Sequence, residues 1–192
     1  DFFDFQALTT DAAFKDTLKS SFVVIQAWGR RKANSYLLAQ HRERMSFSKT
    51  IQAIKNMRLA FPKANACLIE DKANGPAIID VLSSSVPGII AVEPLGSKEA
   101  RAEAAAPLIH AGNIYLPHED ECKWTKAFIA EWLAVPTGAF WDQVDASAQY
   151  MLKYGRLYQI DLSKLIEEGV STNAVIAEQS DSPWSMQRDF RP

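Results

Sequence analysis

The sequence predicts an α/β fold with a mixed sheet, in which three antiparallel strands are followed by strand–helix alternation with helices on both faces. Near the N-terminus, three apolar or alternating runs are joined by short connections, which is typical of an antiparallel meander. From residue 46 onward, segments with helical spacing alternate with short apolar runs. The length of 192 residues, with 47% hydrophobic and 23% charged residues, is typical of a globular domain.

The first half of the chain supplies four predicted strands and one helix. The strands are rich in β-branched or aromatic residues, or alternate in hydropathy. They cover residues 5–10, 21–28, 34–42 and 66–69. A basic turn is expected over 29–32, between the second and third strands. Ser46 is a good N-cap, and the helix that follows carries apolar residues at helical spacing until Pro62 closes it.

The second half alternates between helices and strands. The predicted helices cover residues 74–85, 97–110, 121–134 and 141–153. Short apolar strands are expected over 88–92 and 114–116. Trp28, Trp124 and Trp132 lie on apolar faces and are predicted core residues. Beyond the last helix the chain is polar and weakly patterned. We therefore expect one domain over residues 1–155 and a polar C-terminal tail over 156–192.

Composition excludes several classes of protein. No apolar run is long enough to span a bilayer, so no membrane partner is expected. The start lacks the features of a signal peptide and an initiator Met, so a fragment of a longer protein is expected. Cys67 and Cys122 form no CxxC pair or zinc spacing, which predicts reduced intracellular thiols. The net charge of -2 argues against a generic polycation but is compatible with a local basic groove.

Acidic residues collect at the ends of predicted elements. Asp11 ends the first strand, Glu70 and Asp71 end the fourth, and Asp142 and Asp145 share a face near the start of the last helix. If the first and fourth strands are neighbours and the helix crosses them, these carboxylates converge. Converging carboxylates repel one another unless cations such as Mg²⁺ or Mn²⁺ neutralise them. On pattern alone, each acid is better read as a helix cap or a surface charge.

Five segments carry a family resemblance. They are TTDAAFKDT (9–17), FVVIQAWGRR (22–31), LIEDKANGPAIIDVL (68–82), GSKEARAEAAAPLIHAGNIYLP (96–117) and VPTGAFWDQVDASAQ (135–149). In this order they resemble the C-terminal nuclease domain of the large terminase subunit of tailed bacteriophages. The resemblance implies an RNase H-like fold. It also implies an endonuclease that cuts concatemers of double-stranded viral DNA during genome packaging, in the cytoplasm of the infected bacterial host.

The resemblance also implies the residues of a two-ion Mg²⁺ or Mn²⁺ site for phosphodiester hydrolysis. Asp11 matches the first catalytic acid of the family and Glu70 the central one. The third acid comes from a His-Asp-Asp-x-x-Asp-Ala motif, which aligns here with residues 140–146. Asp142 is then the third catalytic acid and metal ligand, with Asp145 as the alternative.

This sequence departs from the family at that motif, because Phe140 and Trp141 stand where the family often has His and the first Asp. Neither side chain can bind Mg²⁺. Asp71 has two readings of equal weight, an acid of the metal site or a charge at the N-terminus of the following helix.

Five basic residues are predicted to contact DNA. They are Lys72, Lys98, Arg101, Arg30 and Arg31. Lysine and arginine grip phosphates without reading sequence. The alternative for each is a solvated surface charge, as on most helix faces and turns.

The resemblance implies partners and leaves alternatives open. No GxxxxGK[ST] loop is present, so the packaging ATPase domain is absent from this chain and is expected as a partner. The small terminase subunit and the portal are further expected partners. The alternatives are a non-catalytic DNA-binding or portal-docking domain, and another RNase H-like enzyme such as a junction resolvase or an integrase.

Overall fold

The computed structural model describes residues 2–12, 22–72 and 75–155. These residues form a mixed six-stranded sheet with the order β5-β4-β1-β2-β3-β6. The strands are β1 (Phe5–Ala12), β2 (Val23–Arg31), β3 (Asn34–Glu43), β4 (Ala64–Glu70), β5 (Ile89–Val92) and β6 (Ile114–Tyr115). β1, β2 and β3 pair antiparallel, as predicted, and the other pairs are parallel. The fold is therefore the expected α/β architecture.

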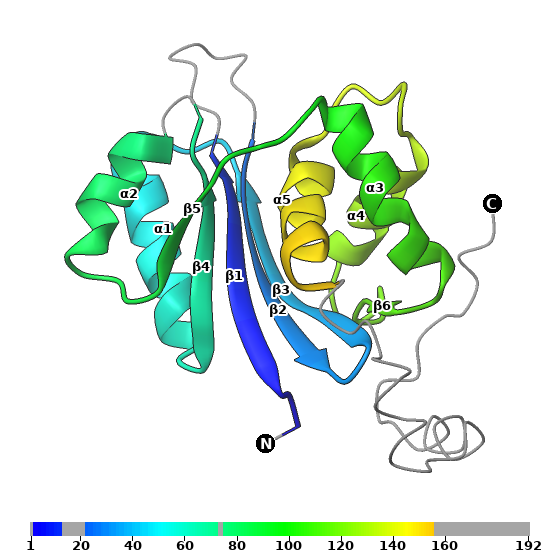
Figure 1. Cartoon of the computed structure of the whole chain (residues 1–192), viewed down its shortest axis with the longest axis horizontal. Helices are drawn as coiled ribbons and strands as arrows, with labels where there is room; N and C mark the ends of the chain where they lie inside the picture. The colour runs from blue at the N-terminus through cyan, green and yellow to red at the C-terminus, as the bar shows by residue number, and fades with distance from the viewer. Residues whose placement is uncertain (1, 13–21, 73–74, 156–192) are drawn as a thin grey trace, which may run out of the picture.

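Helices cover both faces of this sheet (Figure 1). They are α1 (Phe47–Ala60), α2 (Gly75–Ser83), α3 (Lys98–His110), α4 (Trp124–Leu133) and α5 (Asp142–Tyr150), the last continued by a π-helical turn, η1 (Met151–Gly155). In Figure 1, α1 and α2 lie on the left of the sheet and α3, α4 and α5 on the right. None of the described helices is long and apolar enough to cross a membrane.

Local sequence explains where two of these helices begin. The Ser46 hydroxyl accepts a hydrogen bond from the Lys49 N–H at 3.5 Å, and the Ser97 hydroxyl accepts one from the Ala100 N–H at 3.2 Å. Each caps one of the amide groups that a helix leaves unpaired at its start. The Ser97 cap fixes the start of α3, which contributes to the site described below.

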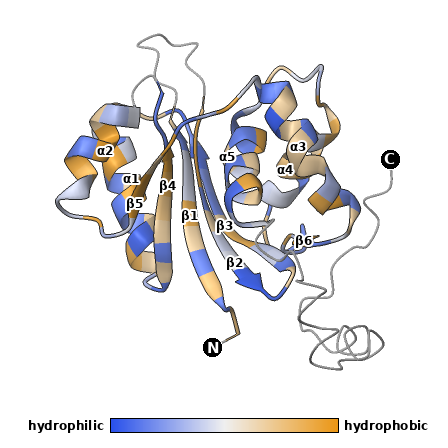
Figure 2. Cartoon of the chain, in the orientation of Figure 1, coloured by the Kyte–Doolittle hydropathy of each residue, from blue (hydrophilic) through white to orange (hydrophobic). Residues whose placement is uncertain are grey.

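The core lies in two layers, one on each face of the sheet. On the α5 side, Trp28 stacks on Tyr150 with ring centroids 4.5 Å apart, and Trp132 packs into the same cluster. On the other side, Ile54 of α1 and Ile78 of α2 pack against β1, β2 and β4. β4 is buried on both faces, as its apolar sequence requires, and β4 and β5 stand out as hydrophobic in Figure 2.

The structure corrects three predicted boundaries. The basic turn was expected to begin at residue 29, but β2 stays paired with β3 as far as the Arg31–Asn34 pair. The turn therefore has only two residues, and one of them, Lys32, has a φ of 54°. The helix expected over 121–134 begins only at Trp124. The helix expected over 141–153 changes to π-helical winding after Tyr150. The predicted tail, 156–192, lies outside the described residues.

Candidate active site

The sheet brings the predicted acids to one end of the fold. β1 and β4 pair in parallel, with Thr10 opposite Ile69, so Asp11 and Glu70 occupy the next adjoining positions on the same face. Helix α5 packs against β1 and β2 on this face, and its first turn carries Asp142 and Asp145. The strand order required for convergence is therefore confirmed. We call Asp11, Glu70, Asp142 and Asp145 the acid cluster.

Asp11 is the most strongly perturbed member of the acid cluster. Burial raises its pKa well above the ordinary value, and the charges of Asp145, Glu70 and Asp142 raise it further, while Lys98 acts in the opposite direction. The residue is 8% exposed, and its buried Oδ2 accepts no hydrogen bond from any described group. A buried carboxylate oxygen without a partner is costly unless a cation or a proton satisfies it.

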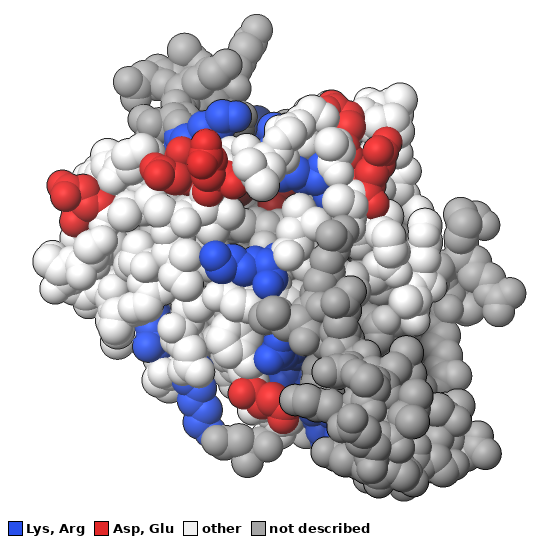
Figure 3. Space-filling view, in the orientation of Figure 1, with Lys and Arg blue, Asp and Glu red and all other residues white. Residues whose placement is uncertain are grey.

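Two basic residues of α3 face the acid cluster. The Lys98 ammonium pairs with Asp145, and the Arg101 guanidinium lies 2.8 Å from Asp145 Oδ1 and 3.9 Å from Glu70 Oε2. Burial acts to lower the pKa of Lys98, but its hydrogen bond and charge interaction with Asp145 raise it overall. In Figure 3, acidic and basic side chains lie side by side near the upper end of the molecule. Both residues are thus engaged within the protein, and their contacts with DNA stay predictions.

The two acids of α5 have different surroundings. Asp145 is held by Lys98 and Arg101. Asp142 lies beside Phe22, whose backbone N–H donates a hydrogen bond to its carboxylate. The pKa of Asp142 is raised by burial and by the Glu131 charge, against the opposing effects of Lys98, Arg42 and this hydrogen bond. Among the described contacts, a lysine and an arginine therefore pair directly with Asp145, whereas none pairs directly with Asp142.

The donor chemistry of the acid cluster suits hard divalent cations. Within residues 2–12, 22–72 and 75–155, no three His, Cys, Asp or Glu side chains are grouped closely enough to hold a metal ion. The cluster nevertheless offers only carboxylate oxygens, the ligands that Mg²⁺ and Mn²⁺ prefer. When all four acids are ionised, as in the presence of a bound cation, Lys98 and Arg101 leave two of the four negative charges uncompensated. The residues present therefore fit a divalent cation in chemistry and charge.

Asp71 and Lys72 follow Glu70 but are not buried with the acid cluster. Both are exposed, and the Asp71 N–H donates to the Val92 carbonyl at 2.8 Å, which prolongs the β4–β5 pairing. Asp71 precedes α2, which begins at Gly75 and has no acid in its first turn, and both readings of Asp71 stay predictions. Lys72 affects the acid cluster only weakly: burial raises the pKa of Glu70, and Lys72 opposes this less than Arg101 does.

Arg30 and Arg31 lie at the opposite end of the sheet. Arg30 pairs with Phe5, six residues before Asp11 on β1, which corresponds to about 20 Å at the rise of a strand. Arg30 donates to the Tyr154 carbonyl at 3.4 Å, and the Arg31 guanidinium lies 4.5 Å from the centre of the Phe2 ring. The fold therefore does not bring these two arginines to the acids.

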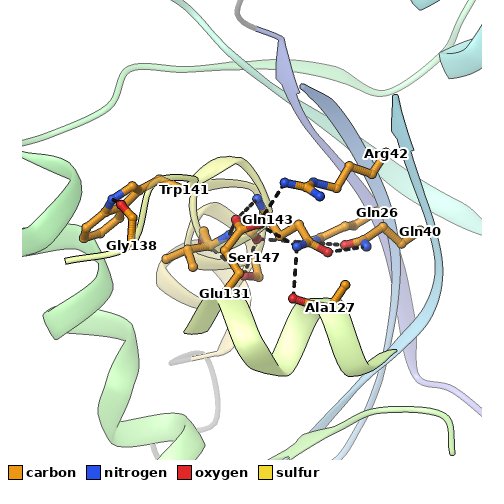
Figure 4. A network of polar contacts seen from close by, with 10 residues as sticks. Gln26, Gln40, Arg42, Ala127, Glu131, Gly138, Trp141, Gln143 and Ser147 are labelled. Carbon is orange, nitrogen blue, oxygen red and sulfur yellow. Dashed lines mark hydrogen bonds and ion pairs between the residues drawn. The ribbon is translucent and has the colours of Figure 1, made fainter. Parts of the chain in front are cut away.

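Glu131 is a site residue that sequence reasoning missed. Trp141, at the N-cap of α5, provides no side-chain cap. Instead Glu131 Oε1, from α4, accepts the backbone N–H groups of Gln143 at 2.7 Å and Val144 at 3.3 Å. Its Oε2 accepts the Gln143 side-chain amide at 2.6 Å and pairs with Arg42 at 3.2 Å (Figure 4). Nothing in the local sequence marks this role, because the cap comes from a different helix.

A line of glutamines ties the same turn to the sheet. Gln26 on β2 donates to Gln40 on β3 at 2.8 Å, and Gln40 donates to Gln143 at 2.7 Å (Figure 4). Trp141 points elsewhere, donating to the Gly138 carbonyl at 3.1 Å. The first turn of α5, which carries Asp142 and Asp145, is thus held from α4 and from two strands.

Comparisons with known proteins agree with this geometry. A family model described as the Terminase RNaseH-like domain matches residues 8–154. Among solved structures, a large terminase from a thermophilic bacteriophage superposes with a TM-score of 0.62 at 11% identity, over 79% of this chain and 40% of that one. The large terminase nuclease of thermophilic phage G20c gives 0.60 at 14% identity, over 78% and 82% of the two chains.

The nuclease domain of the bacteriophage SPP1 large terminase, solved with bound Mn, gives a TM-score of 0.54 at 12% identity, over 79% of this chain and 87% of that one. At these identities the structural matches show the fold. This chain spans about 40% of the length of the first of these terminases. No curated protein sequence gave a significant match. Because the family model covers most of the described fold, this chain belongs to the Terminase RNaseH-like domain family.

Proposed function

We propose that this chain is a metal-dependent endonuclease domain that cuts concatemers of double-stranded viral DNA during genome packaging. The observation that carries the proposal is the convergence of Asp11, Glu70 and the two acids of α5 at one end of the sheet. Proteins with this fold include large terminase nucleases of phages G20c and SPP1. The family membership and the acid cluster support the same function independently.

Asp11, Glu70 and Asp142 are the proposed ligands of Mg²⁺ or Mn²⁺. Related nuclease domains have been solved with bound Mn or zinc, which supports a divalent ion in this fold. When bound, such ions supply an activated water and stabilise the charge that develops on the phosphate oxygens. The two uncompensated charges of the acid cluster balance one divalent ion. For the predicted pair of ions, the DNA phosphate supplies additional negative charge.

Lys98 and Arg101 keep the acid cluster assembled. Together they neutralise Asp145, and Arg101 also approaches Glu70, which limits the repulsion among four neighbouring carboxylates. Asp145 is accordingly a counter-ion that orients Lys98 and Arg101, and Asp142 is left as the third ligand. This assignment keeps the site intact although Phe140 and Trp141 replace residues of the family motif.

Further partners are proposed from the longer relatives. The large terminase that this chain matches over part of its length has also been solved with ADP and with ATP-γ-S, and this chain covers 39% of each of those chains. We therefore expect a packaging ATPase domain to act beside this nuclease domain, together with the small terminase subunit and the portal. The expected location is the cytoplasm of the infected bacterial host.

Plasmid cleavage tests the proposal. The wild-type chain should nick and linearise supercoiled plasmid in Mn²⁺ or Mg²⁺, more slowly as salt rises, because salt weakens phosphate contacts. Glu70→Ala and Asp11→Ala should lose cleavage while keeping the circular dichroism of the folded chain. Glu103→Ala is the matched control, since it removes an exposed acid of α3 that lies outside the acid cluster, and should cut normally.

Full cutting by Glu70→Ala would overturn the assignment. A folded wild type that binds plasmid but leaves it uncut in millimolar Mn²⁺ would favour the non-catalytic DNA-binding or portal-docking alternative. One observation speaks for that alternative, namely that Lys98 and Arg101 already engage two of the acids. Four-way junctions cut in preference to plasmid would favour a resolvase.

A further inference from the structure

Two phenylalanines and two arginines form a ridge beside the acid cluster, which we call the Phe–Arg ridge. The rings of Phe22 and Phe140 meet edge to face with centroids 5.5 Å apart. The Arg42 guanidinium lies 4.0 Å from the centre of the Phe22 ring and 5.4 Å from that of Phe140, and the Arg44 guanidinium lies 4.3 Å from that of Phe22. Phe140 remains 46% exposed and Arg44 is exposed.

The Phe–Arg ridge is fixed to the proposed metal ligands. Asp11 pairs with Val24 across β1 and β2, and Val24 pairs with Arg42 across β2 and β3, so Asp11 and Arg42 stand two strands apart. That separation is about 10 Å at the usual spacing of strands. The Phe22 N–H also donates to the Asp142 carboxylate, and Phe140 precedes Asp142 by two residues. Any movement of the ridge is therefore coupled to Asp142.

We infer that the Phe–Arg ridge is a DNA-contact surface that holds the DNA backbone a few nucleotides from the scissile phosphate. This inference rests on the proposed function and names residues through which the same site grips its substrate. Arg44 contacts a backbone phosphate, and Phe140 packs against the sugar of a neighbouring nucleotide. A strand advances about 3.4 Å per nucleotide along the duplex, so a phosphate at Asp11 places the ridge about three nucleotides away.

Charge explains why the occupant is DNA. The acid cluster carries excess negative charge and repels a phosphate backbone unless cations stand at its edge. Lys98 and Arg101 are engaged with the acids, and Arg30 and Arg31 lie at the other end of the sheet. The ridge supplies two guanidinium groups at the β3 edge of the cluster.

Ring contact also suits the two guanidinium groups for phosphate binding. A guanidinium stacked on an aromatic face keeps its in-plane N–H groups directed outward, where they can bind a phosphate. Arg42 also pairs with Glu131 at 3.2 Å, and Glu131 holds the first turn of α5, so the exposed Arg44 is the residue to substitute in a test of phosphate contact (Figure 4 shows the Arg42–Glu131 pair).

DNA binding measured without cutting tests the inference. The probe is a fluorescein-labelled duplex of about three helical turns, titrated with the full chain in EDTA and followed by anisotropy at several salt concentrations. Phe140→Ala should weaken binding by about three- to tenfold without changing the salt slope, because it removes an apolar contact with the sugar and no charge. Arg44→Gln should weaken binding and reduce the salt slope by about one, the signature of one lost phosphate contact.

Matched controls come from α4, away from the ridge residues in the sequence. Leu133→Ala removes an apolar side chain that is 63% exposed, and Lys126→Gln removes an exposed charge from the same helix. Both should bind within about twofold of wild type, because neither residue belongs to the ridge. If Phe140→Ala is poorly folded, Phe140→Leu keeps apolar volume but lacks the flat ring, and should still weaken binding.

The inference is overturned if folded ridge variants bind the duplex as tightly as the controls, which would assign the ridge to another partner such as a protein surface. The experiment also separates this failure from failure of the proposed nuclease. If the wild type cuts plasmid in Mn²⁺ and the ridge variants bind DNA normally, only the assignment of the ridge is refuted. If the wild type never cuts but the ridge variants bind DNA more weakly, the assignment of the ridge is supported and the proposed nuclease activity is refuted.

Discussion

Glu131→Ala is expected to loosen the first turn of α5 and the acids that it carries. Glu131 is 8% exposed, and its two oxygens serve the backbone N–H groups of Gln143 and Val144, the Gln143 amide and Arg42. Alanine leaves all four without this acceptor. The variant should therefore lose stability and also weaken binding of divalent ions, because Asp142 is no longer held in position.

The magnitude follows from those contacts. Loss of a helix cap costs about 1 kcal/mol, and removing one partner of a buried ion pair costs about 3–5 kcal/mol. The Arg42 side chain is 23% exposed, so solvent offsets part of the second cost and we expect about 3 kcal/mol in total. For a chain of this size that corresponds to a fall in Tm of roughly 6–12 °C. Glu131→Gln keeps one acceptor oxygen for the two N–H groups and should lose only about 1–2 kcal/mol.

Urea unfolding and thermal melting measure these losses, with Glu103→Ala, an exposed glutamate of α3, as the control expected within about 0.5 kcal/mol of wild type. A second readout separates positioning from stability. The Glu131 charge raises the pKa of Asp142, so carboxylate NMR of Glu131→Gln should show a lower Asp142 pKa than wild type. A Glu131→Ala variant that melts with the control and binds Mn²⁺ like wild type would refute the reasoning.

Two further predictions concern the strands that carry the acids. Burial raises the pKa of Asp11 in the folded state, so stability falls as the pH rises from the unfolded-state pKa of 3.8 through the folded-state pKa. Asp11→Asn should therefore raise the Tm at neutral pH and above. Thermal melts should show this gain in Tm shrink as the pH falls toward the unfolded-state pKa. At Gly75, an added Cβ would lie 1.7 Å from the Glu70 carbonyl oxygen. Gly75→Ala should thus cost about 2–4 kcal/mol in urea unfolding and reduce cleavage; Gly112→Ala, which has a φ of 74° but meets nothing within 4 Å, should cost about 1 kcal/mol and cut normally, and equal losses in the two variants would contradict the close contact with Glu70.

Much of this fold follows from local pattern. Alternating runs, a Ser46 cap and the order of elements were sufficient to predict a mixed sheet whose first three strands are antiparallel. The convergence of the acids was predicted on the condition that the first and fourth strands are neighbours, and β1 and β4 meet that condition. Trp28 and Trp132 were predicted as core residues from the apolar faces that carry them, and both are buried.

The direction of charged side chains did not follow from local pattern. Lys98 and Arg101 have the same spacing on α3 whether that face meets solvent or acids, and only the packing of α3 beside α5 decides between them. Glu131 likewise lies on an amphipathic helix, and its burial depends on where the next helix begins. Arg30 and Arg31 lie at the C-terminal end of β2, and because β2 runs antiparallel to β1 this end is far from Asp11. Each of these outcomes depends on contacts between elements distant in the chain.

The acid cluster draws on the beginning, the middle and the last α-helix of the described fold, and this has a consequence for synthesis. A ribosome releases Asp11 long before it reaches Asp142, so no nascent chain that stops short of α5 can bring the four carboxylates together. Under the proposed function, such an unfinished polypeptide has no cutting activity. The order of the elements in the chain therefore keeps the nuclease inactive until α5 has been synthesised, and no inhibitor is required.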